Sequence, residues 1–316
     1  MLRSFGKWVT VFIFLVVSPL LMVTDTCAGQ VLRFGVLPVV DTLPLWVGRE
    51  EGFFKSKGLD LEIVPFQSAL ERDAALQAGK LDGYFGDILN TLLLARSRLT
   101  LEIVTTAFKA NPVHRMFALV TAPESGIQDL DGLKGKPVAI SRATIIEYLL
   151  DRLLQAYGKG PGYVEKQEIK KIPIRLQMLL ANQIPAALLP EPLVTLAETK
   201  GGRVLLDDRI LETTLTILAL KRGLAGKDPS LVPRFLEAYG KAVDAINANP
   251  GGYMATLLNR TRFPKSLKDR YSIPGFPPVT LPDPKDIEDA QDWLIRNGLM
   301  DTPMAYEEVV YSGRAR

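Results

Sequence analysis

The stretch Leu45-Trp-Val-Gly-Arg-Glu-Glu-Gly-Phe-Phe-Lys-Ser-Lys-Gly-Leu-Asp-Leu-Glu-Ile-Val64 joins two kinds of secondary structure. Its first part lies in a predicted helix from about Leu43 to Lys55, which Lys57-Gly58 closes. From Leu59 to Phe66, apolar and polar residues alternate with the period of a strand. A helix followed directly by a strand is the repeating unit of an α/β fold.

The same alternation continues outward from this stretch. The Ser68-Ala-Leu-Glu71 and Thr144-Ile-Ile-Glu147 segments are capping boxes that predict helix starts. The rhythm predicts an α/β fold with mostly parallel sheets and helices on both faces. Strands are predicted at 31–37, 81–86, 101–108, 115–121, 136–141, 168–174, 186–189 and 203–206, helices at 69–78, 88–96, 144–157, 229–249 and 284–297, and an extended loop at 271–284.

Composition excludes several function classes. The 316 residues include 38 Lys and Arg against 35 Asp and Glu, a balance that argues against a nucleic-acid partner. The single Cys, Cys27, excludes an intramolecular disulfide and a Cys zinc cluster, and the single His, His114, excludes motifs with two His ligands. We therefore expect neither a metal site nor a cofactor, and we interpret His114 as structural.

Residues 1–29 are typical of an export signal. Arg3 and Lys7 precede an apolar run over 8–23, and the small residues Cys27-Ala28-Gly29 follow. The run is shorter than the roughly 20 residues that span a membrane, which favours cleavage over a retained anchor. Lipid attachment at Cys27 is a third alternative, which the preceding residues 24–26 fit poorly. These features predict a periplasmic protein.

Four segments together resemble a known family. They are the opening stretch 45–64, Leu76-Gln-Ala-Gly-Lys-Leu-Asp-Gly83, Asp129-Leu-Asp-Gly-Leu-Lys-Gly-Lys-Pro-Val-Ala-Ile-Ser141 and Leu189-Pro-Glu-Pro192. In this order they resemble the nitrate/taurine/sulfonate-type solute-binding proteins of ABC importers, a group that also includes binders of thiamine-precursor pyrimidines. The resemblance covers about 31–250.

The resemblance implies a two-lobed periplasmic binding protein of type II. Residues 30–112 and 215–316 would form one lobe and 113–214 the other, with two crossover strands at the hinge. A ligand would lie in the cleft, and the lobes would close on it. The partners implied are a small solute, a membrane permease and its ATPase, and the protein itself would be a monomer.

Candidate ligand-binding residues follow from the loops that end the predicted strands, where α/β sheets bind ligands. Loop 38–46 holds Asp41, Thr42 and Trp46, and loop 66–68 holds Gln67 and Ser68. The resemblance adds Glu191. The remaining candidates are Asp87 in loop 86–90 and Ser141, Arg142 and Thr144 in loop 141–144.

These candidates point to two ligand chemistries. Helix starts beside Arg142 suit an anion, whereas Asp41, Asp87 and Glu191 suit an amine or a ring N–H, and Trp46 can stack on a flat ligand. Each also has a structural alternative. The Ser, Thr and Asp side chains can simply cap helices, Arg142 can be solvated, and Glu191 can serve a hinge contact.

The sequence therefore predicts a non-enzymatic subunit that captures a small polar or anionic solute of the sulfonate, taurine or nitrate kind. A thiamine-precursor pyrimidine or another aromatic amine is the alternative ligand. A secreted enzyme or a sensor that reuses the fold is the alternative function. The chain lacks the G-x-S-x-G nucleophile elbow and the G-x-x-x-x-G-K-[ST] phosphate loop, which disfavours an enzyme.

Overall fold

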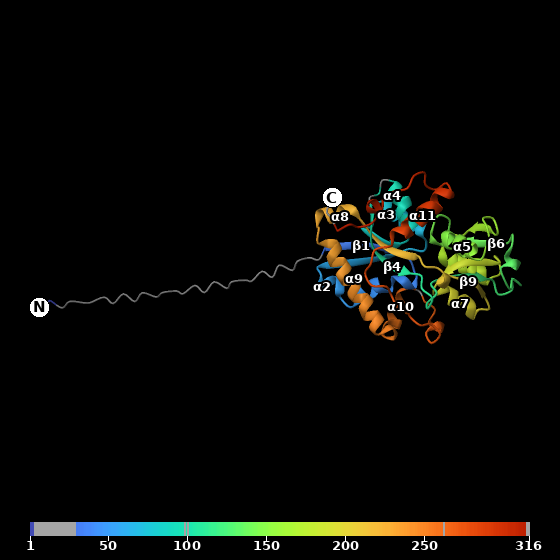
Figure 1. Cartoon of the computed structure of the whole chain (residues 1–316). Helices are drawn as coiled ribbons and strands as arrows, with labels where there is room; N and C mark the ends of the chain where they lie inside the picture. Colours follow the sequence, from blue (N-terminus) through green and yellow to red (C-terminus); the bar gives the residue numbers. More distant parts are fainter. Residues whose placement is uncertain (3–29, 98, 100, 262, 314–316) are drawn as a thin grey trace.

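The protein forms two α/β lobes. The structure is a computed structural model that describes residues 1–2, 30–97, 99, 101–261 and 263–313. One lobe contains the segments near both ends of the described fold, and the green and yellow middle of the chain forms the other (Figure 1). Residues 3–29 of the predicted export signal, with Cys27, lie outside the described residues. In the part of the chain that the structure describes, no helix has the length and apolar character needed to cross a membrane.

The first lobe is built on a five-stranded sheet of order β2-β1-β3-β10-β4. β2, β1 and β3 run parallel, and β10 runs antiparallel to both of its neighbours. Phe34 lies opposite Ile63 on one side and Gly83 on the other, which fixes the register at the centre of the sheet. The strands are β1 Gln30–Val36, β2 Leu59–Pro65, β3 Gly83–Gly86, β4 Leu101–Lys109 and β10 Thr214–Lys221.

Helices cover both faces of this sheet because successive residues of β1 point to opposite sides. The ring of Phe34 stacks on Phe235 of α9, with centroids 5.6 Å apart. Gly35 faces α3, where an added Cβ would lie 3.1 Å from Arg72 Cγ and 2.6 Å from Leu81 Cδ1, so the close packing requires glycine. The helices of this lobe are α1 Leu43–Glu50, α2 Phe53–Ser56, α3 Ala69–Gln77, α4 Ile88–Arg96, α8 Arg222–Lys227, α9 Leu231–Ala248, α10 Met254–Arg260, α11 Pro284–Arg296 and α12 Tyr306–Val309.

The second lobe has a five-stranded sheet of order β7-β6-β8-β5-β9, in which β5 alone runs antiparallel to its neighbours. α5 buries Leu149, Leu150 and Leu153 in the main core. A separate apolar cluster that includes Val120 and Leu179 packs with α6 and α7. The elements are β5 Phe117–Thr121, β6 Pro137–Ile140, α5 Ile145–Ala156, β7 Glu165–Glu168, α6 Ile172–Leu180, β8 Ala186–Pro190, α7 Leu193–Thr199 and β9 Arg203–Asp207.

Two segments connect the sheets. The chain passes from β4 to β5 between Lys109 and Phe117, and it returns from β9 to β10 between Asp207 and Thr214. The predicted fold, with two lobes of mostly parallel strands and two crossovers, is confirmed. The lobe boundaries given above, 30–112 with 215–316 and 113–214, stay a prediction.

Two predicted elements are wrong. The helix expected over 43–55 is divided into α1 and α2, because Gly52 adopts a left-handed backbone with φ +73°. The strand expected over 168–174 ends at Glu168, and α6 begins at Ile172. Pro173 stands in the first helical turn, where its missing N–H costs nothing, so the apolar Ile172-Pro-Ile174 run starts a helix.

Candidate functional site

A cavity lies between the two lobes, where loops at strand ends face one another. Its atom-free space is about 490 Å³, a volume that includes space open to solvent. Of the predicted site residues, four line this cavity, namely Asp41, Asp87, Ser141 and Thr144. The first lobe also contributes Leu37, Val39, Ala69, Arg72, Phe85 and Gly86, and the second contributes Phe117, Ile145, Ile146, Lys170, Ile172, Arg175 and Pro190.

Arg175 is the least compensated charge in this cavity. It lies in the first turn of α6 and is completely buried. Its Nη1 donates to the carbonyl of Ile169 at 3.3 Å, whereas Nε and Nη2 have no hydrogen-bond partner among the described residues. Burial lowers the pKa of this guanidinium to about 10. The site therefore holds a positive group with two free donors.

Sequence reasoning missed Arg175 because the predicted strand over 168–174 ended just before it. A helix predicted over these residues would have identified Arg175 as a buried charge. Ile172, Arg175, Leu176 and Leu179 are the buried residues of α6, so the arginine stands on the apolar face of its helix. A charged residue at such a position is rarely buried without a partner.

Arg72, the other fully buried arginine of the cavity, differs from Arg175 because its charge is paired. Its guanidinium donates to Asp73 Oδ1 at 2.6 and 2.9 Å and to the carbonyl of Phe85 at 2.6 Å. It also donates to Asn90 Oδ1 at 3.2 Å, and it lies 4.6 Å from the ring centre of Tyr84. Arg72 is thus part of the frame of the cavity.

The start of α5 forms one wall of the cavity. Thr144 caps the helix by accepting the N–H of Ile146 at 3.2 Å, and its hydroxyl donates to the carbonyl of Ser141 at 2.8 Å. The Glu147 carboxylate accepts the N–H of Ala143 at 2.8 Å, one residue earlier than the predicted box requires. The capping role of Thr144 is therefore confirmed, and the hydroxyl still borders the cavity.

Two buried carboxylates of the first lobe reach the cavity. Asp41 accepts the hydroxyl proton of Thr216 at 2.7 Å, and burial raises its pKa to about 7. Asp87 caps α4 by accepting the N–H of Asn90 at 2.8 Å, and burial raises its pKa to about 6. Asp87 thus combines its predicted capping role with a place in the cavity wall, whereas Asp41 lines the cavity without capping a helix.

Gln67 and Ser68 precede Ala69, which lines the cavity, but they are not among the described lining residues, and a role for them in ligand binding stays a prediction. The Ser68 hydroxyl accepts the N–H of Glu71 at 3.2 Å, which confirms the predicted cap of α3. The carbonyl of Gln67 accepts the N–H of Ile172 in the other lobe at 3.2 Å. Beside this contact, Lys171 and Glu71 form an ion pair at 3.3 Å.

Thr42, Trp46 and Arg142 do not line the cavity among the described residues. The hydroxyl of Thr42 is buried and donates to the carbonyl of Val39 at 2.8 Å. Trp46 is buried in α1, with the guanidinium of Arg260 5.5 Å from its ring centre. Arg142 is half exposed and donates to the carbonyl of Lys166 at 3.0 Å. A role for these three in ligand binding stays a prediction.

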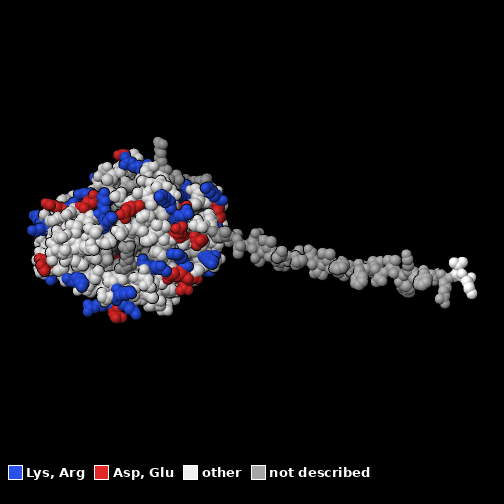
Figure 2. Space-filling view, turned by 180° about the vertical axis from the view of Figure 1, so that it is seen from behind, with Lys and Arg blue, Asp and Glu red and all other residues white. Residues whose placement is uncertain are grey.

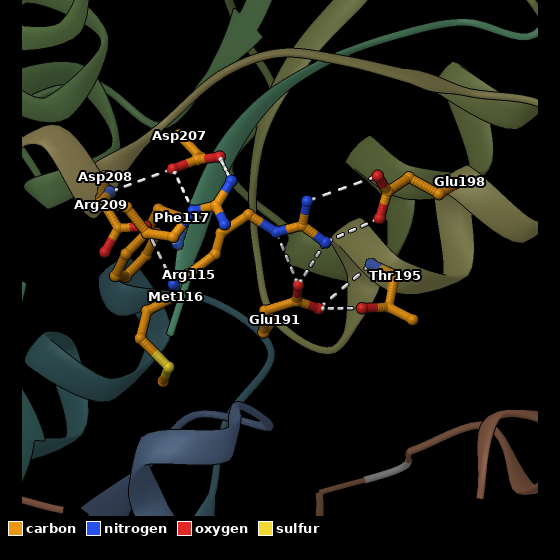
Figure 3. Close-up of polar contacts among 9 residues, drawn as sticks. All are labelled: Arg115, Met116, Phe117, Glu191, Thr195, Glu198, Asp207, Asp208 and Arg209. Carbon is orange, nitrogen blue, oxygen red and sulfur yellow. Dashed lines mark hydrogen bonds and ion pairs between the residues drawn. The ribbon is translucent and has the colours of Figure 1, made fainter. Parts of the chain in front are cut away.

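Glu191 belongs to a charged cluster beside the crossovers (Figure 3). Its Oε1 accepts from Arg115 Nε at 2.9 Å, and its Oε2 accepts from the hydroxyl of Thr195 at 2.9 Å. Arg115 also pairs with Glu198 at 2.7 Å. Burial raises the pKa of Glu191, against the opposing effect of Arg115. These contacts favour the structural alternative for Glu191.

Asp208 connects the two crossovers in the same cluster (Figure 3). Its Oδ1 accepts the N–H groups of Met116 and Phe117, both at 2.9 Å. Burial raises the pKa of Asp208 to about 6. Since Phe117 lines the cavity, this carboxylate sets the position of one cavity wall relative to the returning strand.

This two-lobed architecture with a cleft is that of the periplasmic binding proteins. The alkanesulfonate-binding protein SsuA from Xanthomonas axonopodis pv. citri, solved with bound MOPS, superposes with a TM-score of 0.76 at 18% identity, over 89% of this chain and 98% of that one. The periplasmic aliphatic sulphonate-binding protein SsuA from Escherichia coli gives a TM-score of 0.73 at 17% identity, over 90% and 92%. At these identities the likeness establishes the fold.

The family follows from the sequence match. A family model described as NMT1/THI5 like matches residues 40–252, so this chain belongs to that family. A protein of Bacillus subtilis (strain 168), described as an aliphatic sulfonates-binding protein, is 26% identical over 207 residues. That match covers 63% of this chain and 61% of the relative's length. The resemblance deduced from the four sequence segments is thereby confirmed.

Proposed function

We propose that this chain is the periplasmic solute-binding subunit of an ABC importer and captures a small organic anion of the sulfonate kind. Arg175 carries the proposal. It is a buried guanidinium in the interlobe cavity with two donors that find no partner among the described residues. A buried charge without partners is costly, and an anionic solute supplies the missing acceptors through short charge-assisted hydrogen bonds.

The rest of the cavity wall indicates an organic solute. Val39 and Phe85 from the first lobe and Phe117, Ile146 and Pro190 from the second present mainly apolar surface. A solute with one anionic group and a short apolar body would contact both the guanidinium and these side chains. Nitrate would use only the guanidinium. The descriptions of the Bacillus, Xanthomonas and Escherichia proteins support the same ligand class.

The mechanism is capture without chemical change. The solute binds the conformation in which the lobes are closed more tightly than the open one, so binding shifts the population toward closure. The closed protein then presents a surface from both lobes to the permease, whose ATPase drives import. A monomer suffices for this cycle, because both walls of the cavity come from one chain.

A second ligand class is favoured by Asp41. Its buried carboxyl group lines the cavity, and with a pKa of about 7 it is partly ionised at neutral pH. The ionised form can accept a hydrogen bond from the N–H of an amine. A thiamine-precursor pyrimidine or another aromatic amine would use this group. Such a ligand leaves Arg175 without an acceptor, which is why we rank the anion first.

Isothermal titration calorimetry of the purified protein tests the proposal. The panel contains butanesulfonate, benzenesulfonate, taurine, nitrate and an aminomethyl-pyrimidine. We expect the organic sulfonates to bind more tightly than nitrate and the pyrimidine not to bind. Binding of the pyrimidine alone would reverse the ranking. Mass spectrometry of the recovered ligand separates capture from catalysis, since a chemically altered ligand would contradict a transport role.

A further inference from the structure

Asp87 forms a hydrogen bond across the cleft to the wall that faces it. Its Oδ1 accepts the N–H of Asn90 at 2.8 Å and so caps α4 in its own lobe. Its Oδ2 accepts the N–H of Ile145, the first residue of α5 in the other lobe, at 3.2 Å. The two oxygens of one buried carboxylate thus serve different lobes.

A second contact runs alongside it. The amide Nδ2 of Asn90 donates to the carbonyl of Ala143 at 3.2 Å, in the loop that leads into α5. Asn90 in turn accepts a hydrogen bond from Arg72 at 3.2 Å, which fixes the amide orientation. The start of α4 is therefore joined to the start of α5 by two polar contacts.

The start of α5 carries the partial positive charge of a helix N-terminus, and its first N–H group, that of Ile145, is accepted by Asp87. Asp87 already places a carboxylate there, and the same cavity is lined by Arg175, whose buried Nε and Nη2 find no partner among the described residues. The cavity therefore contains two halves of one anion site. One half is a helix start that a carboxylate already occupies, and the other half is a guanidinium without an acceptor. Among the described residues, the helix end has a counter-charge in Asp87, whereas Nε and Nη2 of Arg175 have no partner.

We propose that Asp87 is an internal counter-anion, which holds the ligand-free lobes together through Ile145 N–H and which the anionic group of the solute displaces. This inference rests on the proposed function, since it needs an anionic solute. Binding is then an exchange of one anion for another at the start of α5. The cavity is closed weakly by the protein's own carboxylate and tightly by the solute.

The substitution Asp87→Asn separates the two roles of the side chain. Asparagine caps helices as well as aspartate does, so α4 keeps its cap. The asparagine side chain carries no negative charge. Its amide nitrogen is a donor that would face the N–H of Ile145, which is also a donor. We expect the ligand-free variant to open, which raises its radius of gyration in small-angle X-ray scattering. We expect its affinity for butanesulfonate to rise about tenfold, because the competing anion is gone.

A reciprocal substitution, Ile145→Pro, removes the donor from the other side. Proline is well accepted at the first helical position, and Thr144 before it has the extended backbone that precedes proline, with ψ 173°. The ligand-free lobes should open as in the first variant. Affinity for butanesulfonate should hardly change, because the substitution removes the same N–H from the solute and from the competing Asp87. The same opening in both variants, with a rise in affinity for Asp87→Asn alone, is the signature of an exchange.

The control is Asp228→Asn, an equal change of charge at a carboxylate that accepts the backbone N–H of Ser230 at 3.0 Å, away from the cavity lining. This control should change neither the radius of gyration of the ligand-free protein nor its affinity for butanesulfonate. If Asp87→Asn fails to fold, Asp87→Ser keeps a capping hydroxyl that is too short to reach Ile145, and the same results are expected.

Unchanged or weaker sulfonate binding by Asp87→Asn, or an unchanged radius, would overturn the exchange and leave the proposed function intact. Absence of anion binding by every variant and by the unchanged protein would overturn both.

Discussion

The substitution Arg175→Met should stabilise the ligand-free protein and strongly weaken solute binding. Burial lowers the pKa of Arg175 from its ordinary value to about 10, so the charged form is less stable in the fold than in the unfolded chain. The difference corresponds to about 3 kcal/mol at neutral pH. Methionine removes that penalty, fills a similar space, and gives up one hydrogen bond to Ile169 worth about 1 kcal/mol.

The expected net gain is about 2 kcal/mol, which raises Tm by about 4 °C in a chain of this size. The loss in binding is larger. The free Nε and Nη2 would each form a charge-assisted hydrogen bond worth about 1.5–3 kcal/mol, so their removal weakens sulfonate binding at least about a hundredfold. Differential scanning calorimetry with and without butanesulfonate measures both effects on the same sample.

Arg72→Met is the matched control, because Arg72 is equally buried and also lines the cavity. Its donors are paired with Asp73, Asn90 and the carbonyl of Phe85. Removal of this guanidinium should therefore lower the free energy of unfolding by about 3 kcal/mol, and Tm should fall with it. A lower Tm for Arg175→Met with sulfonate binding intact would show that Arg175 is structural and would refute the reasoning.

Three further outcomes follow from single contacts. Asp41→Asn should raise Tm more at about pH 8 than at about pH 5, because the neutral carboxyl group contributes its full stability below the unfolded pKa of 3.8, has lost part of it by about pH 5 and has lost all of it once pH rises through the folded pKa of about 7; thermal melts across this range measure the difference, and a difference independent of pH would contradict it. Ser68→Ala should lower the free energy of unfolding by about 1 kcal/mol through loss of the α3 cap, as urea titration will show, whereas Ser68→Asp should preserve it. Trp293→Phe should favour the open form, because it removes the Nε1 hydrogen bond to Asp151 that joins α11 to α5 at 2.9 Å but keeps a ring beside Tyr148; scattering without ligand measures the opening, and an unchanged radius would assign α11 no role in closure.

The sequence predicted what local patterns determine. Ser68 and Thr144 were expected to cap helices, and both accept the N–H groups that a cap accepts. The predicted loops at strand ends do meet in the cavity, since the carboxyl ends of parallel strands lie at one edge of a sheet. The same logic placed Asp41 and Asp87 correctly at the cleft.

What depends on contacts between the lobes was beyond sequence reasoning. The partner of Asp87 is Ile145, in another lobe, and no local pattern joins the two. Trp46 stands in a loop-to-helix segment that suggested ligand stacking, yet packing against Arg260 determines its environment. Arg175 was hidden because β-branched residues around Pro173 satisfy the pattern of a strand as well as that of a helix start.

The charges around the cavity explain why the site would accept an anion and hold only one. Arg72 is neutralised by Asp73, and the helix end at Ile145 is neutralised by Asp87, so Arg175 is left with free donors. An anion on Arg175 would bring negative charge toward Asp87, and the two would compete for the same helix end. The affinity would then be the difference between two anions at one site, which allows firm capture together with release when the lobes separate.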